Sequence, residues 1–421
     1  MTLRRRGGAR REVIGDVPAH RRGPPGGLGQ MTHPESGIRR AVRGWVTALA
    51  AAMVGCEGGQ AAPIPDACEE APVAPTDVIG RVVALASGDQ NGCAVFEDGS
   101  VRCWGDNSWG QLGDGTLVGG ARPIQTEGLP RVQQVVVGTE HVCALTTGQC
   151  VWCWGGSPDG QLGIESLSGS RTPVLVDSLR GTLSLATYAQ TNIALNLNQV
   201  LWWGQGTEGD IRVPTVLREG EVYRAVDLGD GFACGLRYDG RVECWGDNRY
   251  GQLGTGDEVS RDEPAVVEGL SGVTQIAVGT VSACALLSDG SLWCWGHNEF
   301  GQVGDGTTTN RVAPQQVELG GVVELSIYTV HVCARTSEGR VWCWGDNGLN
   351  EIGNGAVDDV VSTPWEIATI SEARAVTVGA DASCALVGEH DVWCWGFNKL
   401  GALGDDTYEN SATPVKVVWG P

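Results

Sequence analysis

A tryptophan–glycine pair recurs seven times along the 421-residue chain and constrains the fold more than any other feature. Subtracting the positions of neighbouring pairs gives separations of 42 to 51 residues. A repeat of about 50 residues with strand-like content is typical of a β-propeller or a solenoid, and it overrules the expectation of two or three separate domains from length alone. The tryptophans are Trp104, Trp154, Trp203, Trp245, Trp295, Trp344 and Trp395.

The fifth copy shows the repeating unit most clearly. Two apolar runs lie within residues 275–287, a Ser-Asp-Gly turn follows at 288–290, and residues 291–295 run back. A glycine-rich loop occupies residues 298–306, and a short strand containing proline precedes the unit at 264–267. Each unit therefore supplies about four short strands, which predicts one propeller blade.

The returning strand of most units is apolar on both faces. In the fifth copy, Trp293 and Trp295 lie on one face of the strand while Leu292 and Cys294 lie on the other. A strand of this kind has to be covered on both faces, and blades packed around an axis provide that cover. We therefore predict an all-β, seven-bladed propeller spanning residues 78–421.

The proline-containing strands suggest how the ring closes. They precede six of the hairpins, whereas the hairpin at Cys93 has none just upstream. A spare strand lies at the C-terminus, Pro414–Val418. We predict that this strand joins the first blade, which would remove two exposed sheet edges. The six prolines are Pro123, Pro173, Pro214, Pro264, Pro314 and Pro364.

Twelve of the 15 cysteines form pairs ten residues apart. A three-residue turn with Gly99 in the left-handed position places Cys93 opposite Cys103, within disulfide reach. The third copy lacks both cysteines and has Ile193 and Trp202 instead, as expected for a bonded pair. Disulfides are therefore predicted, with buried free thiols as the alternative. The predicted bonds join Cys93 to Cys103, Cys143 to Cys153, Cys234 to Cys244, Cys284 to Cys294, Cys333 to Cys343 and Cys384 to Cys394.

Cys68 and Cys150 fall outside this pattern, and they either bond to each other or stay free. Cys150 and Cys153 form a C-x-x-C string, but a metal or redox site is disfavoured because Cys153 is already paired with Cys143.

Three motifs resemble those of a known family. They are Cys-Ala-Leu near the first strand, Val-x-Cys-Trp-Gly, and the loop Asn107-Ser-Trp-Gly-Gln-Leu-Gly-Asp-Gly115, which recurs at 248–256. Together they resemble the regulator-of-chromosome-condensation repeat over residues 78–421. The resemblance implies a seven-bladed β-propeller. Family members include nuclear exchange factors for a small GTPase, a plant ultraviolet photoreceptor and secreted bacterial inhibitor proteins. The photoreceptor's repeated Gly-Trp-Arg-His-Thr motif does not occur in this sequence.

The N-terminal region has the opposite charge to the rest of the chain. Residues 1–56 hold ten Arg and three acidic residues, a net charge of +7, so a total of -21 leaves -28 for residues 57–421. Arginines followed by a short apolar run predict a signal peptide at 31–55, with residues 1–30 upstream of the true start. Met53-Val-Gly-Cys56 resembles a bacterial lipoprotein signal, which implies lipidation of Cys56. The alternative is an ordinary secretory signal with Cys56 incidental. Residues 56–77 read as an Ala/Pro-rich tether.

No catalytic, metal or cofactor site is predicted. The six histidines show no Ser/His/Asp arrangement and no metal-ligand spacing. His141 and His331 occupy one repeat position and are interpreted as scaffold residues. An export signal contradicts a nuclear exchange factor, and the negative charge argues against nucleic acid.

These observations predict a bacterial lipoprotein that is exported to the outer membrane or cell surface. We expect a monomeric, non-catalytic scaffold that binds an envelope protein or polysaccharide and contacts the bilayer through acylated Cys56. The alternatives are an envelope enzyme with its active site in the central funnel and a purely structural envelope component. The shortened third unit suggests a binding notch at Gln205, Thr207, Glu208 and Asp210; simple decay of one copy is the competing interpretation.

Overall fold

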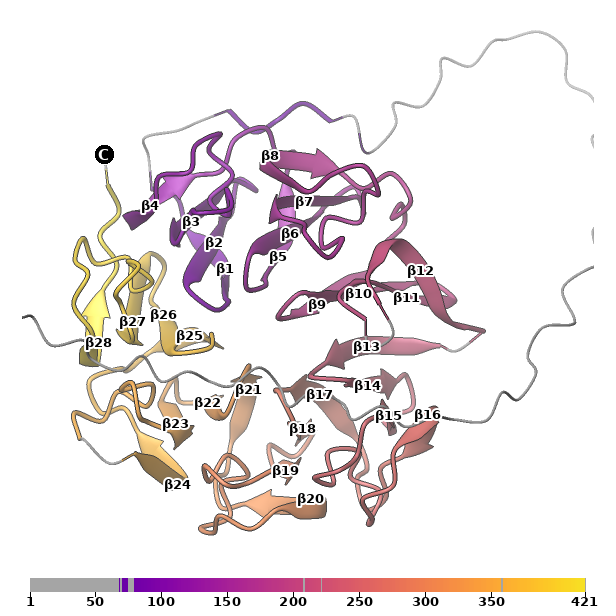
Figure 1. The fold of residues 1–421 in the computed structure, drawn as a ribbon. Helices are drawn as coiled ribbons and strands as arrows, with labels where there is room; N and C mark the ends of the chain where they lie inside the picture. The colour runs from indigo at the N-terminus through magenta and orange to yellow at the C-terminus, as the bar shows by residue number, and fades with distance from the viewer. Residues whose placement is uncertain are drawn as a thin grey trace, which may run out of the picture. The chain divides into compact units, whose positions relative to one another are not determined.

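The computed structural model describes residues 68, 70–74, 79–206, 209–220, 222–356 and 359–420. The regular elements of these residues are β-strands, arranged as seven four-stranded antiparallel sheets around an axis (Figure 1). The predicted all-β, seven-bladed propeller is therefore confirmed. The segment 1–30, the predicted signal peptide at 31–55 and Cys56 lie outside the described residues. None of the described residues belongs to a helix long and apolar enough to cross a membrane.

Each blade consists of four strands that are consecutive in the sequence, with the first strand nearest the axis. The blades are β1–β4 (Val82–Ser87, Asn91–Phe96, Val101–Gly105, Gly120–Gln125), β5–β8 (Val132–Val137, His141–Thr146, Val151–Gly156, Gly169–Leu175), β9–β12 (Ser184–Tyr188, Thr191–Asn196, Gln199–Gly204, Ile211–Glu219), β13–β16 (Tyr223–Leu228, Phe232–Arg237, Val242–Gly246, Arg261–Val266), β17–β20 (Val273–Val278, Ser282–Leu287, Leu292–Gly296, Arg311–Val317), β21–β24 (Val322–Ile327, His331–Thr336, Val341–Asp346, Val360–Glu366) and β25–β28 (Ala373–Val378, Ala382–Val387, Asp391–Gly396, Ser411–Lys416).

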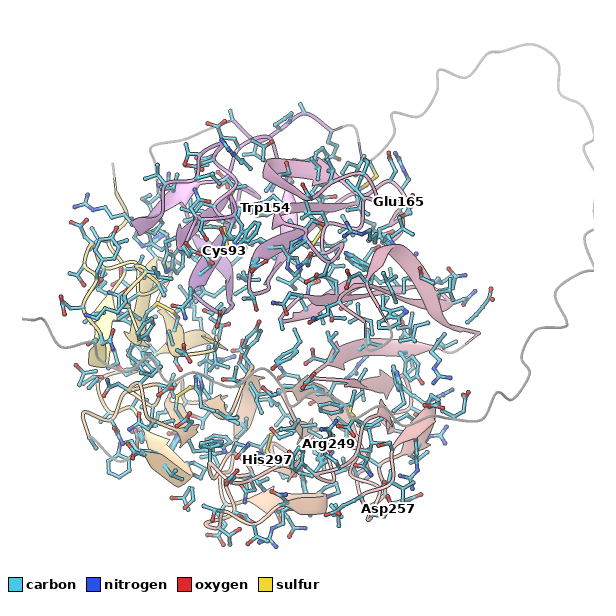
Figure 2. The ribbon with its side chains drawn as sticks, viewed as in Figure 1. Cys93, Trp154, Glu165, Arg249, Asp257 and His297 are labelled. Atoms are coloured by element: carbon cyan, nitrogen blue, oxygen red, sulfur yellow. A yellow bond between two sulfur atoms is a disulfide. The ribbon has the colours of Figure 1, made fainter. Side chains whose placement is uncertain are left out.

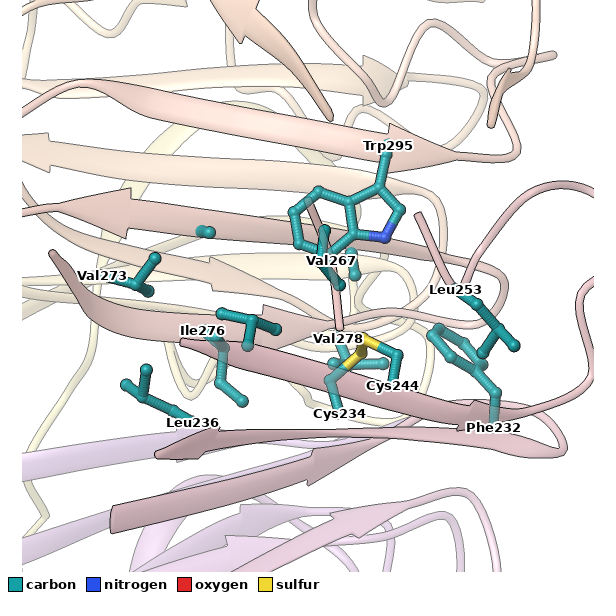
Figure 3. Close-up of a cluster of buried hydrophobic side chains, with 13 residues drawn as sticks. Phe232, Cys234, Leu236, Cys244, Leu253, Val267, Val273, Ile276, Val278 and Trp295 are labelled. Atoms are coloured by element: carbon teal, nitrogen blue, oxygen red, sulfur yellow. A yellow bond between two sulfur atoms is a disulfide. The ribbon is translucent and has the colours of Figure 1, made fainter. Parts of the chain in front are cut away.

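The hydrophobic cores lie between neighbouring blades, because the second and third strands of each blade, which form its hairpin, are apolar on both faces. Figure 3 shows one such core, in which Trp295 of the fifth blade packs with Leu253 and the Cys234–Cys244 pair of the fourth. Each interface of this kind buries side chains from two sheets, so each blade depends on its neighbours to cover its apolar faces.

All six predicted cysteine pairs form disulfides within their hairpins, so the alternative of buried free thiols is wrong. Cys93 lies directly opposite Cys103 across β2 and β3, and Gly99 in the turn has a φ of 84°. In the third blade Ile193 and Trp202 form the equivalent cross-strand pair. Ten-residue spacing therefore follows from the turn length, which fixes the register of the hairpin. The bonds join Cys93 to Cys103, Cys143 to Cys153, Cys234 to Cys244, Cys284 to Cys294, Cys333 to Cys343 and Cys384 to Cys394.

The predicted exchange of the C-terminal strand into the first blade is wrong. β28, which contains Pro414, pairs with β27 of the seventh blade, and the first blade is completed by its own β4. The proline-containing strands therefore follow their hairpins and form the outer edge of each sheet. Proline suits an edge strand because its missing N–H removes no ladder hydrogen bond there.

Packing and a few hydrogen bonds close the ring instead of strand exchange. Trp419, just beyond β28, packs edge-on against Phe96 and Trp104 of the first blade, at centroid distances of 5.5 and 6.1 Å. The backbone N–H of Val82 donates to Glu389 O at 2.9 Å. The C-terminal residues thus contribute to closure through side-chain contacts between the last and first blades.

The propeller has two distinct axial faces. One face, named the loop face here, carries the turns between first and second strands and the long loops between third and fourth strands. In the first blade these two segments are joined by Asp106 N–H donating to Gln90 O. The opposite turn face carries the turns between second and third strands and the connectors to the next blade, joined there by Val132 N–H donating to Gly99 O.

Candidate binding surface

The long loops of the loop face are held rigidly by a buried side chain. In the first blade Asn107 Oδ1 accepts the backbone N–H of Leu112 at 2.9 Å, and its Nδ2 donates to Asp114 Oδ1, Thr116 Oγ1 and Val118 O. Ser157 makes the corresponding contact to the backbone of the second-blade loop. The loops therefore behave as part of the scaffold. The equivalent asparagines are Asn107, Asn248, Asn298, Asn347 and Asn398, all buried.

Six of these loops also cover the buried tryptophan of the next blade. In the first of them, Gln111 O accepts the indole N–H of Trp154 at 2.7 Å, and Leu112 is fully buried within the loop. Figure 2 labels Trp154 in the second blade. A backbone carbonyl of the loop thus satisfies each indole at the seam between blades. The six donor–acceptor pairs are Trp154–Gln111, Trp203–Gln161, Trp295–Gln252, Trp344–Gln302, Trp395–Glu351 and Trp104–Ala402.

The seventh seam, between the third and fourth blades, is different because β11 and β12 are joined by only residues 205–210. No described residue accepts a hydrogen bond from Nε1 of Trp245. The guanidinium of Arg218 lies over the Trp245 ring at 5.7 Å and donates to Asp262 O and, at 2.5 Å, to Glu263 Oε2.

Arg218 thereby donates to the outer strand of the next blade a hydrogen bond that a loop residue donates at other seams. In the first blade, Gly115 N–H donates at 3.0 Å to Arg171 O in the outer strand of the next blade. Asp262 has the same register position in the fourth blade as Arg171 has in the second. The predicted notch is therefore filled in part by an arginine side chain.

The residues predicted for the notch lie on the loop face. Gln205 and Asp210 are exposed at the two ends of the short loop, and Thr207 and Glu208 lie outside the described residues. Asp210 is close enough to contribute, after burial, to the raised pKa of Asp159 in the second blade. Burial, Asp159 and Asp106 in turn raise the pKa of Glu140. Carboxyl groups from three blades thus contribute to one another's electrostatic environment, a relation that residue spacing in the sequence did not reveal.

The central cavity, about 270 Å³, is lined by the first strands of all seven blades. Asp227 is the one carboxyl group among its described lining residues, and no histidine is among them. Its carboxylate accepts the N–H groups of Leu228 and Val278, so it joins the fourth blade to the fifth. Burial raises the pKa of Asp227 to about 7. Asp227 therefore makes an inter-blade contact in the wall of the central cavity.

The histidines at the shared repeat position are buried. His331 Nε2 lies 2.9 Å from Ser383 Oγ, but the Ser383 hydroxyl donates to Glu351 O and neither side chain reaches solvent. Burial lowers the pKa of His331 to about 3. His141 similarly contacts Asn192 at 2.8 Å. The pairs join neighbouring blades, in agreement with their interpretation as scaffold residues. The described part of the chain contains no group of three or more potential metal ligands.

Comparison with known proteins identifies the repeats. Two family models, both described as the regulator of chromosome condensation (RCC1) repeat, match the chain. The chain belongs to this family. One model matches residues 98–145, 239–286 and 289–334, and the other matches 82–111, 132–161, 223–252, 273–302 and 322–351.

Solved structures support the same fold. Prp20p from Saccharomyces cerevisiae is 23% identical with a TM-score of 0.66, and the match covers 81% of this chain and 88% of Prp20p. Human WBSCR16 is 20% identical with a TM-score of 0.66, over 75% of this chain and 94% of WBSCR16. At these identities the likeness concerns the RCC1 propeller fold.

Proposed function

We propose that this RCC1-repeat protein is a non-catalytic, protein-binding scaffold of a bacterial cell envelope, anchored by lipid on Cys56. The observation that carries the proposal is the construction of the loop face. Buried Asn and Ser side chains hold its loops, and six loops are fixed again by an indole of the next blade. Loops held in place on a rigid scaffold can bind a partner without a large ordering cost.

The charge of the chain after Cys56 favours a basic partner. The chain from residue 57 onward has a net charge of -28, obtained by subtracting +7 for residues 1–56 from the total of -21. Electrostatic complementarity would speed association and make it sensitive to salt. Prp20p, a propeller of this fold, is described with binding properties to Gsp1p and histones, so protein recognition is compatible with the architecture.

The binding surface is proposed to include the loop face near the third blade. Gln205 and Asp210 are exposed there, and Thr207 and Glu208 belong to the same short loop. A partner would meet the carboxyl groups of Asp159 and Asp210 beside a loop shorter than its counterparts. Since Arg218 partly fills the seam, we place recognition on the exposed surface and not in a deep recess.

Affinity capture tests the binding proposal. The immobilised protein should retain a basic envelope protein at low salt and release it as salt rises. Replacing residues 205–210 by the fourth-blade loop, residues 247–256, should weaken retention while leaving the circular dichroism spectrum unchanged. The matched control inserts two Ser residues at the exposed turn 288–290 on the opposite face. Equal retention by the folded loop graft would place the binding surface elsewhere.

Anchoring is tested separately by palmitate labelling in a bacterial host. The wild-type chain should incorporate label, and Cys56→Ser should not. The variant should still be exported if the signal is intact, since export and acylation are distinct steps. Equal labelling of both proteins, or none in the wild type, would contradict anchoring at Cys56.

A further inference from the structure

The residues that precede the first blade are fixed at the turn face. Cys68 forms a disulfide with Cys150, which lies immediately before β7 at the turn between the second and third strands of the second blade. Both cysteines are buried, with exposures of 5% and 1%. A few residues later, the N–H of Val73 donates at 2.8 Å to Leu129 O, in the connector between the first two blades.

The chain then enters β1 from the same face. The carbonyl of Gly80 accepts a hydrogen bond from His390 Nδ1 at 2.9 Å. His390 lies in the turn between β26 and β27 of the seventh blade, another turn-face segment. The segment before β1 therefore contacts the second blade, the connector at Leu129 and the seventh blade, all on the turn face.

The Cys68–Cys150 bond differs in kind from the hairpin disulfides. The six hairpin bonds each join residues ten apart, whereas this bond joins residues 82 apart. Every blade is complete without it, because Cys68 precedes the first strand and Cys150 belongs to a hairpin already closed by Cys143 and Cys153. What the bond adds is a fixed exit point for the N-terminal tether.

We propose that the Cys68–Cys150 disulfide is an orienting clasp that keeps the turn face toward the membrane and directs the loop face away from it. The inference rests on the proposed N-terminal anchoring and adds to it the face that a partner can reach. A partner approaching from outside the membrane would then meet the loop face first.

The clasp also sets the reach of the tether. With the bond, 11 residues, 57–67, separate Cys56 from the fixed Cys68, and a segment of this length can span at most about 38 Å. Without the clasp and the Val73 contact, the separating segment would comprise 22 residues, 57–78, and could span at most about 77 Å. The shorter reach of the tether restricts rotation of the propeller relative to the membrane. Because the tether is attached at the second blade, that side of the propeller is held closest to the lipid.

The test measures the distance of each face from a membrane. The mature chain from residue 57, with a polyhistidine tag in front, is bound to vesicles that contain a nickel-chelating lipid and an acceptor dye. A donor dye is attached through an azide-bearing residue, at Glu97 on the turn face or at Val118 on the loop face. The two positions are 67% and 70% exposed and belong to the same blade. The comparison variant is Cys68→Ser/Cys150→Ser, with folding checked by its melting curve.

With the clasp intact, energy transfer should be strong from position 97 and weak from position 118, and the difference should shrink in the double serine variant. Equal transfer from the two positions in the bonded protein, or an unchanged difference in a folded double variant, would overturn the proposal. The nickel lipid replaces the natural anchor, so this experiment does not depend on lipidation of Cys56. Failure of palmitate labelling at Cys56 would therefore contradict the proposed anchoring without contradicting the orienting role of the disulfide.

Discussion

Glu351 occupies a position held by glutamine in four other blades, and replacing it by Gln should remove a pH dependence of stability. In the first blade, Gln111 Oε1 accepts the N–H of Trp109 at 2.9 Å while Nε2 donates to Asp106 Oδ2 at 3.0 Å. An amide makes both contacts at any pH because it carries one acceptor and one donor group. The four glutamines are Gln111, Gln161, Gln252 and Gln302.

Glu351 can make both contacts only when its carboxyl group is protonated. Its Oε2 accepts the N–H of Leu349 at 2.7 Å, and the side chain is 2% exposed near Asp346. Burial, followed by the charge of Asp346, raises the pKa of Glu351 from 4.5 to about 8. At 1.36 kcal/mol per pKa unit, the ionised group would cost at most about 5 kcal/mol, with structural relaxation reducing this value.

The sign of the effect follows from proton binding. Between pH 4.5 and about 8 the folded protein holds a proton that the unfolded chain has lost, so this contribution is complete below pH 4.5 and is lost as pH rises through about 8. Glu351→Gln should therefore match the wild type near pH 4.5 and be more stable at pH 9, by a few kcal/mol.

Thermal unfolding followed by circular dichroism at pH 5, 7 and 9 measures this difference. Gln252→Glu is the reciprocal variant and should acquire the pH dependence that Glu351→Gln loses, because Asp247 lies beside it. Glu299→Gln, at a side chain 77% exposed, is the matched control and should change stability by less than about 0.5 kcal/mol. A Glu351→Gln protein that loses as much stability as the wild type between pH 5 and 9 would refute the reasoning.

Three further outcomes are expected. Deleting residues 411–421 should cause aggregation or a large fall in melting temperature, since it exposes β27 as an edge and removes Trp419; an unchanged melting temperature would contradict this role. Intact-mass measurement should show a gain of 14 hydrogens on reduction, two for each of seven disulfides, and fewer would mean open pairs. Arg218→Ala should destabilise the protein by about 1–3 kcal/mol, measured against exposed Arg241→Ala, and equal effects would contradict its role at the seam.

Local geometry explains why the blades and hairpin disulfides could be predicted from the sequence. A three-residue turn leaves one register for the hairpin, so the spacing of Cys93 and Cys103 determines that they face each other. A strand with two indoles on one face and apolar residues on the other has to be buried on both faces, which favoured a closed ring of blades. These inferences depend only on residues within about 15 positions of one another, so the sequence of one repeat contains all the information they need.

The phase of the repeat could not be derived in this way. Six residues, 126–131, separate β4 from the next blade, whereas fourteen, 106–119, separate it from its own partner β3. The shorter separation in sequence therefore led to the wrong prediction, in which each proline-containing strand pairs with the hairpin that follows it. The longer connection is nevertheless fixed in place, because Asn107 hydrogen-bonds Leu112 N–H and Val118 O and Leu112 is buried within the loop.

The third blade shows how one missing loop is tolerated in a closed ring. Tyr223 packs 6.0 Å from Trp245, and a side chain at the facing position 235 would meet the tyrosine ring at 2.5 Å, so glycine stands where most blades have alanine. Tyr223 OH also donates to Glu243, while Arg218 covers the indole. Several substitutions at one seam thus replace the contacts of the loop. Because these side chains support the seam, the short loop at Gln205 does not have to make the indole contact that its six counterparts make. Its surface residues can therefore vary for recognition without loss of the ring.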